Sequence, residues 1–238
     1  MNFVDGEILY LDKPLGWTSF DVVKRVRSIL LRRLGMKKLK VGHAGTLDPL
    51  ATGVVIVTTG RSTRLIEQLQ AGVKEYVATL QLGATTPSYD LEHPIDANYP
   101  TDHITRPMIE EALQTFVGEI MQVPPAFSAC KVEGKRAYDL ARRGEEVALK
   151  AKPLRIDEIE LLHCNLPARE ITLRVVCSKG TYIRALARDI GLALHSGAHL
   201  TALRRTRVGN YSEHDCFTLD SFEQWLSQQT IETDLPNS

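Results

Sequence analysis

The sequence has few cysteines, and their arrangement is not typical of a cross-linked or metal-binding protein. Four cysteines occur among 238 residues, and none of them forms a CxxC pair. This spacing argues against a disulfide framework and a zinc site, and it favours a reduced, cytoplasmic setting. We therefore expect a fold that needs neither cross-links nor a structural metal.

Other familiar signatures are missing as well. The first ten residues contain acidic but no basic side chains, so they do not resemble a signal peptide. No apolar run approaches the roughly 18 residues that a membrane span needs. No GK[ST] sequence follows a glycine-rich stretch, which argues against a phosphate loop. These absences favour a protein that is not bound to a membrane and that has no phosphate loop.

Charge is balanced overall but is distributed unevenly along the chain. Lys plus Arg and Asp plus Glu both number 29. Residues 1–64 and residues 174–207 each have a net charge of +6, whereas residues 65–173 and residues 208–238 each have a net charge of −6. The two basic blocks could form one face that binds RNA, or they could remain two separate solvated faces.

The distribution of apolar residues predicts one large domain that mixes helices and strands. With 43% hydrophobic and 24% charged residues, the composition is that of a globular protein. The patterns predict strands over residues 7–11, 54–58, 75–82, 156–163, 170–177 and 200–208. They predict helices from Thr18 or Ser19 to Gly35, and over residues 61–70, 106–116, 136–143, 181–194 and 220–226. Because no strict βαβ rhythm is present, we expect an α+β fold around a large mixed or mainly antiparallel sheet.

The most informative segment is 41–53, with the sequence VGHAGTLDPLATG. Its three glycines permit tight backbone geometry, and Pro49 favours an extended conformation for Asp48. A carboxylate held on a rigid loop suits a nucleophile or a general base, although Asp-Pro also occurs in ordinary turns. His43 has no partner histidine at metal-binding spacing, so we expect no metal site here.

The sequence GHAGTLDPLATG resembles the catalytic motif of the TruB family of tRNA pseudouridine synthases. Four other segments resemble further motifs of that family in the same order: LDKPLGWTSF (11–20), KEYVATLQLG (74–83), SKGTYIRALARDIG (178–191) and LRRTRVG (203–209). The matches cover most of residues 7–222. The resemblance implies the pseudouridine synthase fold, with a central sheet flanked by helices.

The resemblance also implies a reaction and a partner. The enzyme would flip one uridine out of the tRNA T loop, conventionally position 55, and isomerise it to pseudouridine. The C1′–N1 glycosidic bond breaks, the uracil turns, and a C1′–C5 bond forms. The family uses no metal or organic cofactor. The implied partner is the T arm of tRNA; we expect a monomer that requires no protein partner.

The resemblance assigns roles to the residues that would surround the reacting base. Asp48 would attack the sugar or, as an alternative, the base, and Arg184 would keep its carboxylate ionised. Tyr76 would stack on the uracil and assist proton transfer, and Tyr182 and Leu203 would line the same pocket. Without the resemblance, Tyr76, Tyr182 and Leu203 would be interpreted as core residues and Arg184 as a surface residue.

Four further residues are implied to bind or position the RNA. His43 matches the residue that fills the space left by the flipped base. Lys13 would support the motif loop or contact a phosphate. Arg204 and Arg205 would contact backbone phosphates, which fix the position of the RNA without reading its sequence.

The resemblance also predicts how the chain is organised. Residues 1–226 would form the catalytic domain, and residues 124–148 within it would be an insertion that clamps the RNA. Residues 227–238 would form a polar, acidic and disordered tail, and we expect no C-terminal PUA domain. His93 stands where the family often has glycine, so the resemblance does not predict the contacts of the loop that contains it.

Three alternative functions are compatible with parts of this pattern. The first is a guide-RNA-dependent relative that modifies ribosomal RNA, which relies on the domain that we do not expect here. The second is an RNA-binding protein that helps tRNA fold without catalysis; Asp48→Ala would leave its function intact. The third is a nucleoside glycosidase, which the basic blocks argue against because a free nucleoside needs no such surface.

Overall fold

A computed structural model gives the fold of the chain. It describes residues 1–128, 130–132, 135–137, 140, 143 and 149–232. The chain divides into two compact units: the first comprises residues 1–74 and 204–238, and the second comprises residues 75–203. Each unit has its own packed core.

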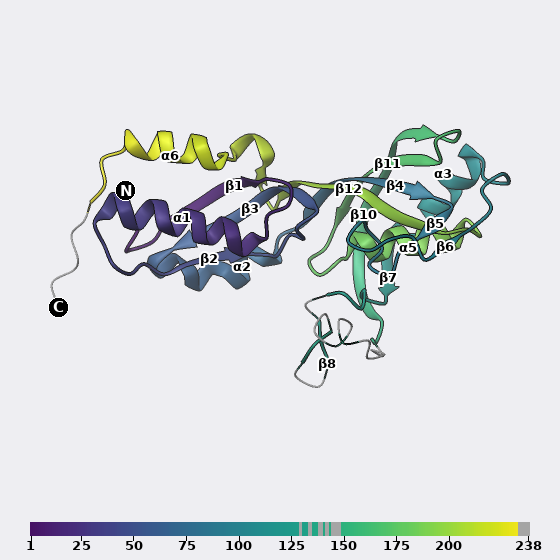
Figure 1. The fold of residues 1–238 in the computed structure, drawn as a ribbon, viewed down its shortest axis with the longest axis horizontal. Coiled ribbons are helices and arrows are strands. Elements are labelled where there is room, and N and C mark those ends of the chain that lie inside the picture. The colour runs from purple at the N-terminus through teal and green to yellow at the C-terminus, as the bar shows by residue number, and fades with distance from the viewer. Residues whose placement is uncertain (129, 133–134, 138–139, 141–142, 144–148, 233–238) are drawn as a thin grey trace. The chain divides into compact units, whose positions relative to one another are not determined.

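The first unit combines a small set of strands with the helices α1 and α6, which lie side by side (Figure 1). Its strand order is β1-β3-β12, with β2 paired to β3 and β13 paired to β12. The pairs β1–β3, β2–β3 and β12–β13 are antiparallel. Its elements are β1 (Ile8–Lys13), α1 (Ser19–Leu34), β2 (Val41–Ala44), β3 (Ala51–Thr59), a 3-10 helix (Gly60–Leu65), α2 (Ile66–Ala71), β13 (Tyr211–Ser212), a second 3-10 helix (Glu213–Asp215) and α6 (Leu219–Ser227).

Helix α1 follows directly from its sequence. Thr18 and Asp21 form a capping box at the N-terminus, and Gly35 ends the helix in the left-handed conformation with φ 63°. Val22, Val26 and Leu30 recur at helical spacing and are fully buried. The predicted helix and both of its ends are confirmed.

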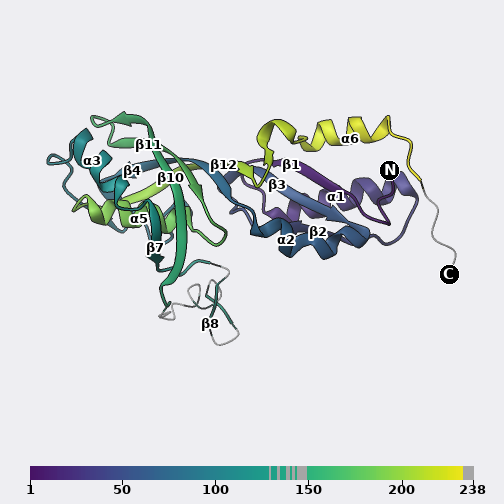
Figure 2. The ribbon, with the colours of Figure 1, turned by 180° about the vertical axis from the view of Figure 1, so that it is seen from behind.

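The second unit contains the longest strands of the molecule, and β10 and β11 form an extended antiparallel hairpin (Figure 2). Its strand order is β12-β4-β11-β10-β7, and β7 is antiparallel to β10. Its elements are β4 (Lys74–Leu82), β5 (Ala84–Thr85), β6 (Ala97–Asn98), α3 (Arg106–Gln114), β7 (Gly118–Gln122), β8 (Lys131–Val132), β9 (Lys135–Arg136), β10 (Lys152–Asn165), β11 (Glu170–Cys177), α5 (Ile183–Ala193) and β12 (Ala198–Val208).

The observed architecture confirms the predicted α+β class with a large sheet, since nine strands belong to one hydrogen-bonded sheet. Seven short or edge strands were not predicted: β2, β5, β6, β7, β8, β9 and β13. The helix predicted over residues 61–70 begins as a 3-10 helix and becomes α-helical only at Ile66. No helix in the described part of the chain is long and apolar enough to cross a membrane.

Two predicted segments fall partly outside the described residues. The insertion predicted over residues 124–148 contains most of the undescribed positions, so its clamping role stays a prediction. The basic helix predicted over residues 136–143 also extends into them, and Arg136 ends strand β9 instead. Within the predicted tail, Glu232 donates from its backbone to the Met1 carbonyl at 2.9 Å.

Candidate active site

Asp48 lies in the tight connection between β2 and β3, in the first unit. The Ala51 amide donates to the Asp48 carbonyl at 3.0 Å, which closes a turn with Pro49 at its second position. Aspartate at the first position and proline at the second position are the residues that such a turn favours. The turn leaves the Asp48 side chain half-buried, so its carboxylate is accessible yet attached to a fixed backbone.

The segment around Asp48 is held in place through its backbone. The Ser19 hydroxyl accepts from the Leu47 amide at 2.8 Å and donates to the Leu47 carbonyl at 3.2 Å. On the other side, the Arg205 guanidinium donates to the carbonyls of Gly45, Thr46 and Val54 at 3.2, 3.3 and 2.8 Å. Because Ser19 and Arg205 are both buried, these bonds are shielded from water, and they fix the loop firmly.

The position of Arg205 differs from the one predicted. A phosphate contact needs an exposed guanidinium, but Arg205 is 2% exposed and donates to backbone carbonyls, at Gly45 and Thr46 of the motif loop and at Val54 of β3. Arg204 is directed into ion pairs with Asp12 at 2.9 Å and Glu213 at 2.5 Å, although its side chain is 36% exposed. The phosphate contact of Arg204 stays a prediction, whereas Arg205 is a structural support.

The last residue of the motif, Gly53, must be glycine for steric reasons. Its φ is +104°, and a Cβ atom there would lie 2.2 Å from the Arg205 carbonyl oxygen.

We expect Gly53→Ala to lower the free energy of unfolding by about 3 kcal/mol or more, because the backbone at Gly53 or Arg205 would have to move to make room for the Cβ atom. Gly118→Ala is the matched control, since Gly118 has φ +105° and open space around it. Urea denaturation measures both, and equal losses would contradict the steric explanation.

Lys13 is a buried cation beneath the motif loop. Its side chain has 0% exposure, and its ammonium group donates to the carbonyls of Trp17, Pro14 and Pro49 at 2.6, 3.0 and 3.3 Å. Burial lowers the pKa of Lys13 to about 8, and the nearby Asp48 carboxylate offsets only part of this effect. This geometry gives Lys13 the supporting role, and leaves it no exposed atom for a phosphate.

The depressed pKa of Lys13 predicts a pH dependence of stability. Between about pH 8 and pH 10.5 the folded protein has lost this proton while the unfolded chain still binds it. The unfolded state therefore binds more protons, and the free energy of unfolding should rise with pH through this window. Urea denaturation of Lys13→Met should lack that rise, and Lys24→Met, at an exposed lysine of the same unit, should retain it. If the stability of Lys13→Met rose with pH as steeply as that of the wild-type protein, Lys13 would not be the group that causes the rise.

His43 lies in β2, opposite Val57 of β3. Burial lowers the pKa of its imidazole, so the neutral form is favoured at neutral pH. Its Nδ1 atom is buried and has no hydrogen-bond partner among the described residues. A neutral, planar ring is suited to fill the space that a flipped base leaves, which is the role that the resemblance implies and which stays a prediction.

Arg184 lies in α5, in the second unit, and is only 5% exposed. Its guanidinium donates to the Ser88 carbonyl at 3.2 Å and to the Phe127 carbonyl at 3.0 Å. The Asp90 carboxylate lies 3.7 Å from its Nε atom. The residue is therefore fixed and buried, and does not sit on the surface as its basic helix alone would suggest.

Asp90 was missed by the sequence analysis. It is 6% exposed, and its carboxylate accepts from the Glu92 amide at 3.0 Å as well as pairing with Arg184. The Thr86 hydroxyl donates to its carbonyl at 2.7 Å, and the intervening Tyr89 adopts a positive φ of 61°. A buried carboxylate on a strained turn is typical of a functional loop. Nothing in a Thr- and Ser-rich loop signals such burial in advance.

The two predicted tyrosines also lie in the second unit. Tyr76 is 8% exposed and lies in β4. Tyr182 precedes α5, where its amide donates to the Gln122 side chain at 3.0 Å and its carbonyl accepts from the same side chain at 3.2 Å. Burial raises the pKa of the Tyr182 hydroxyl, which keeps it protonated. Leu203 is partly buried in β12.

Each unit thus brings together its own share of the predicted residues. Lys13, His43, Asp48 and Arg205 gather at the motif loop of the first unit. In the second unit, Arg184 and Tyr182 lie at the same end of α5. Phe127, whose carbonyl binds Arg184, packs against His93, with 4.4 Å between the centroids of the two rings. The pairing of Asp48 with Arg184 joins the two units and stays a prediction. Within the described residues, no group of three or more His, Cys, Asp or Glu is placed to hold a metal ion.

Comparison with known families gives the class of enzyme. Residues 32–183 match the family model described as TruB family pseudouridylate synthase (N terminal domain). Residues 184–237 match the model described as tRNA pseudouridylate synthase B C-terminal domain. The chain is therefore a pseudouridine synthase, an isomerase that converts uridine in RNA to pseudouridine. Within that class, this chain belongs to the TruB family.

Relatives of the same length support this assignment. The chain is 69% identical to tRNA pseudouridine synthase B of Phocaeicola vulgatus, over 98% of both chains. It is 67% identical to tRNA pseudouridine synthase B of Bacteroides thetaiotaomicron, over the full length of both. A short form of the family is thus found in several bacteria, as the sequence predicts.

Two solved structures confirm the fold. A chain of a Cbf5-Nop10-Gar1 complex is similar with a TM-score of 0.69 and 32% identity. A chain of an H/ACA RNP bound to a substrate RNA containing 2′-deoxyuridine is similar with a TM-score of 0.67 and 30% identity. Our chain is covered to 94% in both cases, but it spans only 56% and 54% of those longer chains.

Proposed function

We propose that this enzyme isomerises uridine 55 in the T loop of tRNA, with the Asp48 carboxylate as its reacting group. The observation that carries the proposal is the placement of Asp48 on a turn whose neighbouring backbone is held by the buried side chains of Ser19 and Arg205. The names of the full-length relatives, tRNA pseudouridine synthase B, support tRNA as the substrate.

The proposed reaction balances without a cofactor. The C1′–N1 bond of the target uridine breaks, the uracil rotates within the closed site, and a C1′–C5 bond forms. The hydrogen at C5 then leaves as a proton, and N1 gains one, so the product is an isomer of the substrate. Asp48 can assist by attack at C1′, by attack at C6 of the base, or by removing a sugar proton to form a glycal; each route uses one ionised carboxylate.

The remaining residues have proposed roles around the flipped base. Arg184 would stabilise the Asp48 carboxylate, since a guanidinium stays charged and can bind a carboxylate with two bonds. Tyr76 would stack on the uracil, with Tyr182 and Leu203 beside it. His43 would occupy the place that the base leaves in the RNA, at a flipping cost of a few kcal/mol.

Tritium release tests the proposal directly. An unmodified tRNA transcript labelled at uridine C5 should lose tritium to water in proportion to pseudouridine formed. The matched control is the same transcript with cytidine at position 55, which should release none. Release from both transcripts would place the reaction at another uridine, and no release from a bound transcript would favour a binding protein without catalysis.

A further inference from the structure

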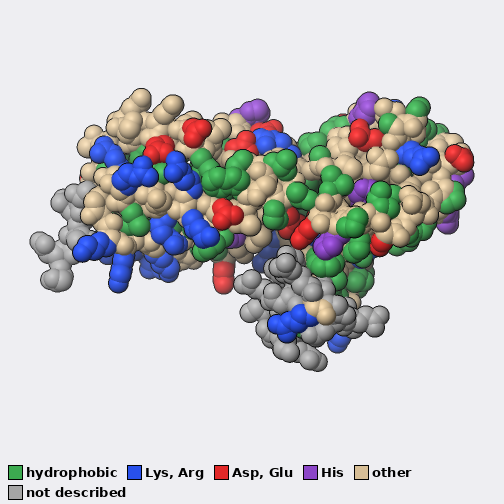
Figure 3. Space-filling model, in the orientation of Figure 1, with side chains coloured by type: hydrophobic (Ala, Val, Ile, Leu, Met, Phe, Trp, Pro, Cys, Tyr) green, Lys and Arg blue, Asp and Glu red, His purple; other side chains and the backbone are tan. Residues whose placement is uncertain are grey.

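The first unit has a strongly one-sided distribution of charge. Residues 13–47 contain nine basic side chains and one acidic side chain, Asp21. Figure 3 shows Lys and Arg side chains gathered over the part of the surface that contains α1. Six of the nine are exposed: Lys40, which lies next to β2, and five that lie on α1 or soon after its end, namely Lys24, Arg32, Arg33, Lys37 and Lys38. These five residues are called the α1 ridge here.

The α1 ridge begins near the motif loop and leads away from it. Ser19, the first residue of α1, is bonded to Leu47, one residue before Asp48. At 1.5 Å per residue, Arg33 lies about 20 Å further along the helix axis. Lys37 and Lys38 follow after the end of the helix at Gly35. The ridge therefore carries positive charge well beyond the reach of a nucleotide bound at Asp48.

Internal ion pairs neutralise only part of the α1 ridge. Lys24 pairs with Asp21 at 3.5 Å, and Glu223 of α6 pairs with Arg32 at 3.4 Å and with Arg25 at 2.9 Å. Arg33 donates only to a neutral backbone carbonyl, at Gln229. In the described part of the chain, Arg33, Lys37 and Lys38 form no ion pair. Three cations at the far end thus lack a counter-charge.

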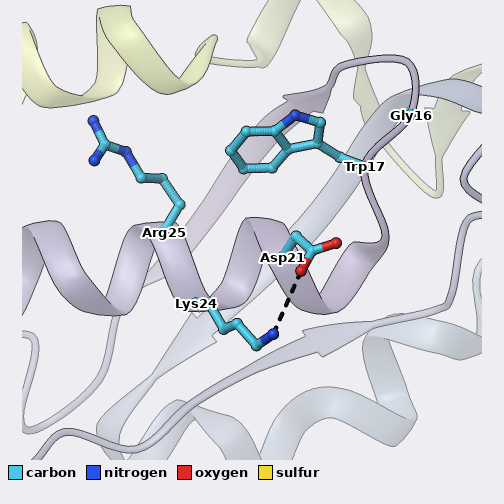
Figure 4. Close-up of a pocket in the computed structure, with 5 residues that line it drawn as sticks. All are labelled: Gly16, Trp17, Asp21, Lys24 and Arg25. Atoms are coloured by element: carbon cyan, nitrogen blue, oxygen red, sulfur yellow. Dashed lines mark ion pairs between the residues drawn. The ribbon is translucent and has the colours of Figure 1, made fainter.

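The near end of the ridge has an aromatic surface. An open hollow of about 450 Å³ is lined by Gly16, Trp17, Asp21, Lys24 and Arg25. Figure 4 shows the Trp17 ring beside the first turns of α1, with the Arg25 side chain further along the helix. Aromatic rings next to cations are the combination that RNA-binding surfaces use to stack bases and neutralise phosphates.

A membrane surface fits these features less well than RNA does. A helix that binds a membrane needs an exposed apolar face that enters the lipid. The apolar face of α1 is already used, because Val22, Val26 and Leu30 are fully buried in the first unit. A polyanion with closely spaced phosphates requires only the exposed cations.

We infer that the α1 ridge is a second RNA-binding surface, which holds backbone phosphates of the tRNA outside the T arm. The inference rests on the proposed function for the identity of the RNA. The far end of the ridge, at Arg33, lies about 20 Å along α1 from the residue that contacts the motif loop, which separates that end from the T loop itself. The ridge would add affinity for the whole tRNA while taking no part in the reaction.

The test compares a full-length tRNA transcript with a T-arm hairpin as substrates. The variant combines Arg33→Gln, Lys37→Gln and Lys38→Gln. We expect KM for tRNA to rise about tenfold with kcat unchanged, and the slope of log affinity against log salt to decrease by about 2–3. The hairpin should be converted with unchanged kcat and KM. Arg106→Gln is the control, since it removes one exposed, ion-paired cation from α3 in the second unit.

Each other outcome overturns the inference. Unchanged KM for tRNA would mean that the ridge does not bind it, and an equal loss on the hairpin would place the contact within the T arm. Filter binding of tRNA to the same proteins separates this inference from the proposed reaction. If no tritium is released but the triple variant binds tRNA about tenfold more weakly, only the reaction is refuted.

Discussion

Asp48→Asn should abolish turnover while the protein stays folded and still binds tRNA. Asparagine has nearly the same shape, and the turn depends on the Asp48 carbonyl, which the substitution keeps. What is lost is the negative charge, on which each of the three possible routes depends. Tritium release from labelled tRNA should fall by about 10⁴-fold or more, as expected when a reacting group is removed.

The same chemical change elsewhere in the first unit provides the control. Asp5 is exposed and pairs with Arg61 at 3.3 Å, so Asp5→Asn removes one carboxylate without touching the motif loop. It should leave release at the wild-type rate. An active Asp48→Asn enzyme would refute the assignment of Asp48 as the reacting group, and loss of tRNA binding in this variant would mean that the site itself is disrupted.

Arg184→Lys should lower kcat by about 100-fold to 1000-fold although it preserves the charge. The planar guanidinium binds two carbonyls and approaches Asp90 at the same time. An ammonium group cannot make these bonds in the same directions, so it would leave buried acceptors unpaired. If Arg184 also holds the reacting carboxylate, the loss should fall on kcat more than on KM, which steady-state tritium release measures.

Arg188→Lys is the matched control for this substitution. Arg188 lies one turn later on α5, donates to the Val123 carbonyl at 3.1 Å and pairs with Asp189 at 2.8 Å. Its replacement disturbs the same helix and the Tyr89 ring on which its guanidinium stacks, but it removes none of the groups that bind Arg184. Equal losses of kcat in both variants would show that helix packing, and not the position of the Arg184 guanidinium, causes the effect.

Local signals in the sequence were sufficient for the long helices and for the central strands. The capping box at Thr18 and the left-handed Gly35 bracket α1, and the β-branched run before Thr59 forms the buried part of β3. Strand β2 could not be predicted in the same way. It contains Gly42 and His43, which have little strand preference, and it forms because β3 supplies a partner for its backbone.

The sites of Arg205 and Asp90 depend on contacts that are distant in the sequence. A run of three arginines among seven residues predicts a surface, yet Arg205 is buried, and it donates to the carbonyls of Gly45, Thr46 and Val54, which lie more than 150 residues earlier in the chain. Asp90 is buried in a loop that the sequence marks only as polar, and its partner Arg184 lies on a helix 94 residues later. The motif loop around Asp48 was found because its residues are contiguous.

The way in which the motif loop is held also bears on how this enzyme could change over time. Ser19, Lys13 and Arg205 all bind peptide groups of the loop, and none of these bonds involves a loop side chain. The shape of the loop is thus independent of what it displays. Exposed positions such as Thr46 and Leu50 are free to vary with the RNA they meet, while the carboxylate between them is presented unchanged. Such a scaffold allows substrate preference to evolve without loss of the reacting group.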